Sequence, residues 1–217
     1  MAEVLDFFAT TPKGMEALLA DELKTLGAER LEQTRAGVAF KGKLETAYRV
    51  CLWSRLANRV LLPLAKFPAP TPEKLYGGVK KIRWSDHLTP DETMAVDFAT
   101  SQSQITHSHF GALKVKDAVV DQLRSVQGSR PSVDTLLPDV RINVYLFKDE
   151  ATVSIDLSGD SLHRRGYREE QREAPMKENL AAAILKIAGM DSLGTDGAFL
   201  DPMCGSGTLP IEAALMA

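Results

Sequence analysis

Short apolar runs alternate with helically spaced apolar residues over the first part of the chain. Runs rich in β-branched and aromatic residues predict strands, and apolar residues three and four positions apart predict helices. The pattern predicts strand 4–9, helix 12–26, strand 37–41, helix 44–52 and strand 60–67. This alternation of strands and helices within a short segment is typical of a compact α+β unit of the ferredoxin-like kind.

Residues that cap, end or bend elements refine this prediction. Thr11 and Pro12 are expected to cap and begin the first helix, and Gly27 to end it. Pro63 confines the third strand to a sheet edge or a bulge, because proline has no N–H for the ladder. The buried stripe of the second helix is expected at Leu44, Ala47, Tyr48, Cys51 and Leu52.

The middle of the chain reads as a second α+β unit. A proline-rich stretch at 68–72 predicts a junction, and a strand is expected at 94–99. The long amphipathic segment 110–126 predicts a helix that Gly128 ends. Strict alternation of apolar and polar residues over 140–157 predicts a β-hairpin. Period two means that one face of this sheet is buried and the other is wet and available to a partner.

The last segment predicts a helix, a strand and a glycine-rich turn into another helix. The first helix is expected to begin at Pro175, with its apolar face at Leu180, Ala183, Ile184 and Ile187. The strand ends on Asp201, at the position where α/β sheets bind ligands. Gly205 and Gly207 tolerate positive φ and allow a ligand close to the backbone. The following helix offers free N–H groups and the positive end of its dipole.

Two known phosphate loops do not fit this turn. A P-loop needs a lysine after its last glycine, and none follows Gly207. A dinucleotide fingerprint needs a third glycine where Pro210 stands. The pattern therefore indicates either another nucleotide-type cofactor site or an ordinary tight turn without a ligand.

Composition excludes several classes. With 44% hydrophobic and 25% charged residues, the 217-residue chain is ordinary for a globular protein. No apolar run is long enough to span a membrane, and the N-terminus lacks the basic region of a signal peptide. Only Cys51 and Cys204 occur, which fits a reducing cytoplasm, and no histidine has metal-ligand spacing with them. His107 and His109 are interpreted as surface residues, so no metal site is expected.

A net charge of −3 gives no global sign of nucleic-acid binding, so any such role must come from a local patch. The segment 163–168 is a candidate, because Arg164, Arg165, Tyr167 and Arg168 surround one glycine. Arginine makes fork-like contacts with phosphate, and arginine or tyrosine can stack on an unpaired base. A solvated basic turn, paired with nearby carboxylates, explains the same residues equally well.

Together these motifs resemble a known family. Residues 201–208, Asp-Pro-Met-Cys-Gly-Ser-Gly-Thr, resemble motif I of class I S-adenosylmethionine-dependent methyltransferases that act on guanine N2 in RNA. Residues 174–180 resemble the helix before that motif, and 11–20 the ferredoxin-like N-terminal segment. Residues 115–121 and 157–168 resemble the THUMP domain, an RNA-binding module. The likeness covers essentially the whole chain in the right order and is strongest to the bacterial large-subunit rRNA enzymes.

The resemblance implies an α+β protein with a ferredoxin-like segment at 1–67, a THUMP domain at 68–165, and a linker helix with the first elements of a Rossmann-like methyltransferase domain at 166–217. It implies S-adenosylmethionine as cofactor and 23S ribosomal RNA as partner. The cofactor-binding positions that it implies are Asp201, Pro202, Cys204, Gly205, Gly207 and Thr208. The RNA-binding candidates are Arg164, Arg165, Tyr167 and Arg168, with Lys114 and Lys116 as weaker ones.

The catalytic motif of the family, Asn or Asp followed by two prolines and an aromatic residue, is not found, since no Pro-Pro pair occurs in these residues. The segment is therefore expected to be inactive alone and to need a downstream domain for cofactor binding. The alternative is a THUMP module that binds RNA without catalysis. A THUMP enzyme that uses ATP for tRNA thiolation fits poorly, because the turn lacks a pyrophosphate-binding pattern.

Overall fold

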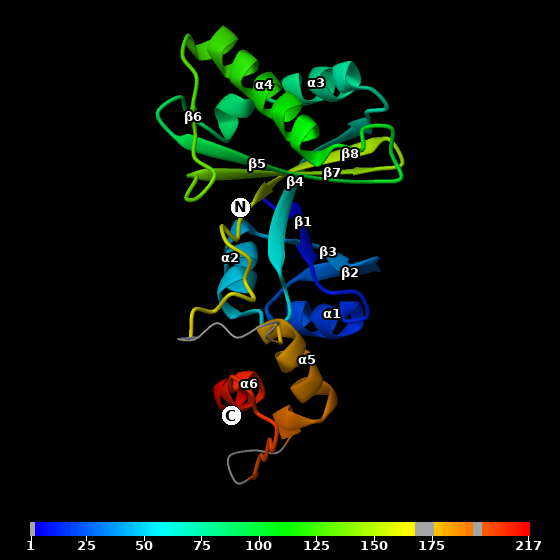
Figure 1. Ribbon diagram of the computed structural model, residues 1–217, viewed down its shortest axis with the longest axis vertical. Helices are drawn as coiled ribbons and strands as arrows, with labels where there is room; N and C mark the ends of the chain where they lie inside the picture. Colours follow the sequence, from blue (N-terminus) through cyan, green and yellow to red (C-terminus); the bar gives the residue numbers. More distant parts are fainter. Residues whose placement is uncertain (1–2, 168–175, 193–196) are drawn as a thin grey trace. The chain divides into compact units, whose positions relative to one another are not determined.

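The computed structural model describes residues 3–167, 176–192 and 197–217 (Figure 1). The chain divides into two compact units, Met1–Val60 with Asp160–Ala217 and Leu61–Gly159. The α+β class is as the sequence predicts.

The first unit contains a small antiparallel sheet. Its strands β1 (Leu5–Thr10), β2 (Glu29–Thr34) and β3 (Gly37–Gly42) are ordered β2-β3-β1. The helices are α1 (Glu16–Thr25), α2 (Leu44–Trp53), α5 (Glu178–Ile187) and α6 (Thr208–Met216), with a 3₁₀ turn η2 (Met190–Ser192) after α5. The rings of Phe7 and Phe40 stack in the core with centroids 5.3 Å apart.

The second unit is a mixed sheet covered by helices on one face (Figure 1). Strand β4 (Arg59–Pro68) runs from the end of the first unit into the second. The order β4-β8-β7-β5-β6 joins it to β5 (Thr93–Ser101), β6 (Ser132–Val133), β7 (Val140–Phe147) and β8 (Glu150–Asp156). Helices α3 (Pro72–Lys80) and α4 (Ser108–Gln127), with the 3₁₀ turn η1 (Trp84–Asp86), bury the core that contains Trp84, Val119 and Leu146.

Several predicted elements are confirmed. The hairpin β7–β8 pairs in antiparallel register, Val144 opposite Val153, through a tight turn in which Lys148 and Asp149 have positive φ. Gly128 ends α4 at φ 78°. The ladder between β4 and β8 shifts register between Pro63 and Ala65, so Pro63 lies at a bulge as predicted.

Helix ends and helix faces were predicted less well. Helix α1 begins at Glu16, not at Pro12, because Gly14 has φ +93°, which no helix allows; the Thr11 hydroxyl instead donates to the Leu56 carbonyl at 3.0 Å. In α2 the buried residues are Ala47 and Val50, and the expected stripe is otherwise partly or fully exposed. Helix α5 begins at Glu178, and Pro175 lies outside the described residues.

The face that α5 buries also differs. Asn179, Ala181, Ala182, Ala183 and Leu185 are buried, while the expected Leu180, Ile184 and Ile187 are exposed. The strand expected before Asp201 does not form among residues 197–201. A strand needs a neighbour for its N–H and C=O groups, and the described strands already pair with one another. Strand β2 and helix α3 were not predicted at all.

Candidate cofactor loop and RNA interface

The glycine-rich turn leads directly into helix α6, as the sequence predicts. Gly205 has φ +56° and Gly207 has φ +77°, both in the left-handed region, and Gly207 is the N-cap residue of α6. The Gly207 N–H donates to the Cys204 carbonyl at 2.8 Å. The Asp201 carboxylate accepts from the Met203 N–H at 3.1 Å, which closes the start of the loop.

The loop leaves space for a ligand against its backbone. An added Cβ at Gly205 would meet only the Met203 carbonyl oxygen, at 4.0 Å. Pro202, Cys204 and Gly205 are exposed, whereas Thr208, at the start of α6, is buried. A polar ligand could therefore approach the backbone N–H groups at the start of α6 without meeting a side chain at Gly205.

The basic segment divides into exposed and buried members. Arg164 is exposed, but the Arg165 guanidinium lies against Glu212 of α6, with Nε 2.8 Å from Oε1. The Nε–H does not point along a hydrogen bond, so this contact is mainly between charges. The Tyr167 hydroxyl donates to the same oxygen at 3.1 Å. Arg168 lies outside the described residues.

Glu212 is a functional candidate that the sequence analysis missed. Its side chain has no solvent exposure, and Arg55 approaches the second carboxylate oxygen at 3.9 Å. Burying a carboxylate is unfavourable unless cations compensate it. The signal was a single acidic residue in the apolar segment 208–216, whose partners lie far away in the sequence.

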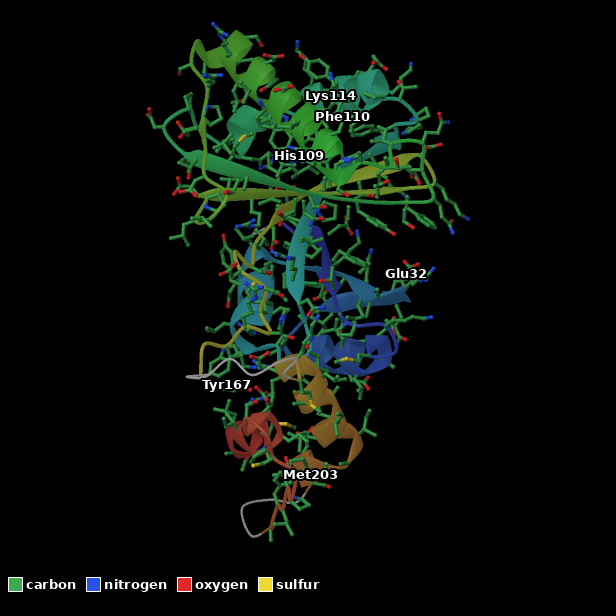
Figure 2. All side chains as sticks on the ribbon, in the orientation of Figure 1. Glu32, His109, Phe110, Lys114, Tyr167 and Met203 are labelled. Carbon is green, nitrogen blue, oxygen red and sulfur yellow. The ribbon has the colours of Figure 1, made fainter. Side chains whose placement is uncertain are left out.

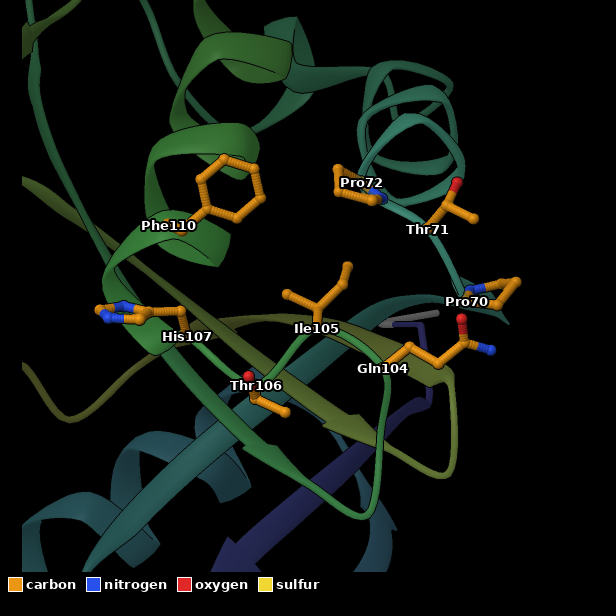
Figure 3. Close-up of a pocket in the computed structure, with 8 residues that line it drawn as sticks. All are labelled: Pro70, Thr71, Pro72, Gln104, Ile105, Thr106, His107 and Phe110. Atoms are coloured by element: carbon orange, nitrogen blue, oxygen red, sulfur yellow. The ribbon is translucent and has the colours of Figure 1, made fainter.

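The second unit carries a pocket of about 340 Å³ where α3 and α4 begin (Figure 3). The lining residues are Pro70, Thr71, Pro72, Gln104, Ile105, Thr106, His107 and Phe110. Phe110 is 41% exposed, and the ammonium of Lys114 lies 5.7 Å from its ring centroid, one turn further along α4 (Figure 2). An exposed aromatic ring beside a cation suits an unpaired base and its phosphate.

The other charged residues near this pocket are less favourable to RNA. Lys116 pairs with Asp117 at 2.5 Å. The backbone N–H of Glu73, followed by the Thr71 hydroxyl, lowers the pKa of the Glu73 carboxyl, which stays ionised at the start of α3. Of the two lysines predicted from the sequence, Lys114 therefore stays the better candidate, because it lies beside Phe110.

In 3–167, 176–192 and 197–217, no three His, Cys, Asp or Glu side chains come together in a way that could hold a metal ion. No helix in these ranges has both the length and the apolarity needed to cross a bilayer.

Comparison with known proteins finds three domain matches along the chain. The model of the RlmL ferredoxin-like domain matches residues 6–61, the THUMP domain model matches 69–156, and the RMKL-like methyltransferase domain model matches 165–217. The chain thus contains the sequence patterns of an RlmL ferredoxin-like domain, a THUMP domain and an RMKL-like methyltransferase domain. The predicted recognition and fold class are thus confirmed.

Individual relatives agree with these domain matches. Ribosomal RNA large subunit methyltransferase K/L of Syntrophotalea carbinolica is 59% identical over 98% of this chain and 30% of its own length. The solved structure of SMU.472 complexed with SAH is 35% identical, covering all of this chain and 56% of that one, with a TM-score of 0.86. A predicted N6-adenine-specific DNA methylase from Listeria monocytogenes is 34% identical over 99% and 55%, with a TM-score of 0.85. The chain spans about 30% of the length of the curated relatives it matches.

Proposed function

We propose that this chain is the RNA-binding and cofactor-loop part of an S-adenosylmethionine-dependent methyltransferase that acts in the cytoplasm on guanine N2 of 23S ribosomal RNA. The observation that carries the proposal is the loop 201–207, which has two glycines with positive φ, an unobstructed Gly205 and a helix directly after it. The likeness to large-subunit rRNA methyltransferases supports the substrate class.

The cofactor would lie against the exposed side of this loop. Gly205 and Gly207 would give close backbone approach, and the N–H groups at the start of α6, beginning at Thr208, would face polar groups of the ligand. Asp201, Pro202 and Cys204 form the rest of the same wall. S-adenosylmethionine would supply an electrophilic methyl group. One wall does not enclose a nucleoside, so we propose that binding and catalysis require residues outside these 217.

The RNA would be held by both units. We propose that Arg164 and Arg168 contact phosphates, and that Lys114 with Phe110 holds an unpaired nucleotide at the pocket. A separate RNA-binding domain suits an enzyme that must bring a base into its active site, because a base inside a duplex is not accessible to the enzyme. For the domain limits, we propose those predicted from the sequence, 1–67, 68–165 and 166–217.

The deciding experiment uses the full-length protein and 23S rRNA from cells that lack the corresponding gene. We expect transfer of one labelled methyl group from S-adenosylmethionine, and mass spectrometry of the digested RNA should identify it as N2-methylguanosine. RNA from cells that carry the gene is the control and should accept no label. Binding of the RNA without methyl transfer would instead support the module without catalysis, and methylation at another atom would refute the guanine-N2 assignment.

A further inference from the structure

Helix α6 is attached to its unit through a buried ion cluster. Its fully or nearly fully buried residues are Thr208, Glu212 and Ala213, none of which is a large apolar side chain. Leu209 and Ile211 are only half-buried, and Leu215 is 50% exposed. No large apolar side chain of this helix is fully buried, and removing one partner of Glu212 would leave an uncompensated buried charge.

The cations of this cluster come from two distant segments. Arg165, with its side chain 19% exposed, pairs with Glu212 and also donates from Nη2 to the Arg55 carbonyl at 2.9 Å. Arg55 reaches Glu212 with Nη1 and donates from Nη2 to the Leu215 carbonyl at the end of α6. One carboxylate thus contacts two guanidinium groups and the Tyr167 hydroxyl.

The loop 54–58, which carries Arg55, is itself fixed. Glu22 of α1 accepts from the Ser54 hydroxyl at 2.5 Å and from the Arg55 N–H at 3.0 Å. Asn179 of α5 donates to the Asn58 side chain at 2.8 Å. The cluster therefore connects α6 to the loop 54–58, which is held by hydrogen bonds to α1 and α5.

We propose that Arg165 and Tyr167 are positioning residues for the cofactor loop rather than RNA contacts. They hold Glu212, which fixes α6, and the loop 201–207 is continuous with the start of that helix. This inference rests on the proposed function, in which the loop binds S-adenosylmethionine. It assigns adjacent arginines different partners, with Arg164 facing RNA and Arg165 facing the methyltransferase helix.

The test uses the full-length protein with Arg165→Gln, Glu212→Gln and Tyr167→Phe, and with Arg164→Gln as the matched control. Calorimetry gives the Kd for S-adenosylmethionine, filter binding gives the Kd for 23S rRNA fragments, and hydrogen exchange follows the amides of 201–216. Because a buried charge that loses its partner is strongly unfavourable, we expect Arg165→Gln and Glu212→Gln each to weaken cofactor binding about tenfold. Tyr167→Phe removes one hydrogen bond to the carboxylate and should weaken it about threefold. The double variant Arg165→Gln with Glu212→Gln should weaken cofactor binding no more than the stronger of the two single variants, because both remove the same ion pair.

Faster exchange over 201–216 with unchanged RNA affinity in Arg165→Gln supports the proposal. Arg164→Gln should instead lower the RNA affinity and leave the exchange over 201–216 unchanged. Loss of RNA affinity in Arg165→Gln equal to that in Arg164→Gln, with normal cofactor binding, would overturn it. If Glu212→Gln does not fold, Tyr167→Phe and Arg165→Lys still decide, because each removes only part of the cluster. If the unaltered protein binds no S-adenosylmethionine, the proposed function fails. Unchanged hydrogen exchange over 201–216 in Arg165→Gln would separately refute the positioning role of the cluster.

Discussion

Two adjacent glycines of helix α3 should respond differently to alanine. A Cβ at Gly78 would lie 2.1 Å from the nearest atom of the Phe67 ring, with two more ring atoms at 2.3 and 2.5 Å. A Cβ at Gly77 would have nothing within 4 Å. Phe67 lies on β4 and packs against the core of the second unit, so its ring cannot move without disturbing that core.

The expected magnitudes follow from two opposing effects. Replacing glycine by alanine inside a helix stabilises it by about 1 kcal/mol. Over-packing a well-packed core costs about 1–3 kcal/mol. Gly77→Ala should therefore raise the free energy of unfolding by about 1 kcal/mol. Gly78→Ala should range from neutral to a loss of about 2 kcal/mol, so the two variants should differ by about 1–3 kcal/mol.

Urea unfolding followed by tryptophan fluorescence measures this difference. The chain has two tryptophans: Trp84 is fully buried in the core beside α3, and Trp53 is 65% exposed in the other unit. The fluorescence change therefore reports mainly on the unit that contains both glycines. Equal shifts of the midpoint in the same direction would refute the close approach of α3 to Phe67.

Three further predictions concern the RNA, the cofactor and pH. In filter-binding assays, Arg164→Gln should weaken RNA binding and reduce by about 1 the slope of log affinity against log salt concentration. Arg35 is also exposed, and Arg35→Gln should change neither quantity. Equal losses in the two variants would contradict a specific contact. Gly205→Val in the full-length protein should abolish S-adenosylmethionine binding in calorimetry while RNA binding persists. The reason is that a branched side chain would stand on the ligand side of a residue with φ +56°. Normal affinity for S-adenosylmethionine would refute the site. The Thr93 N–H and then its hydroxyl lower the pKa of Asp139 below 3.8, so its stabilisation is complete above that value and is lost as pH falls through the lower folded pKa. Asp139→Asn should flatten the acid limb of the melting temperature, and an unchanged limb would contradict this.

Strong periodicity predicted the parts of the fold that neighbouring residues determine. The hairpin β7–β8 and helix α4 have long, regular patterns, and both form as expected. Strand β2, with the sequence Glu-Arg-Leu-Glu-Gln-Thr, was missed because it is mostly exposed and has no apolar alternation. Helix α3 was missed although Thr71 caps it with Pro72 at its start, because the proline-rich stretch was interpreted only as a junction.

The glycine-rich turn before α6 could be predicted because glycine is the residue that most readily adopts positive φ. The buried face of α5 could not, since its sequence is apolar on more than one side and only tertiary contacts choose between them. Asn179 faces inward to meet Asn58, which takes Ile184 and Ile187 to the solvent side of the helix in this structure. A polar side chain with a buried partner can thus decide the orientation of an otherwise ambiguous helix.

Tertiary contacts also explain why the sequence alone could not assign different roles to the arginines of the segment 163–168. Arg164 and Arg165 have identical chemistry, and local charge counting assigns both to solvent or both to phosphate. What separates them is a carboxylate at Glu212, which becomes a neighbour only when α6 packs against the N-terminal domain. A buried carboxylate requires cations, so the helix that carries it selects the arginine it can reach. The exposed Arg164 remains available to RNA, and a basic cluster of this kind should be assigned only after every buried acid has its partner.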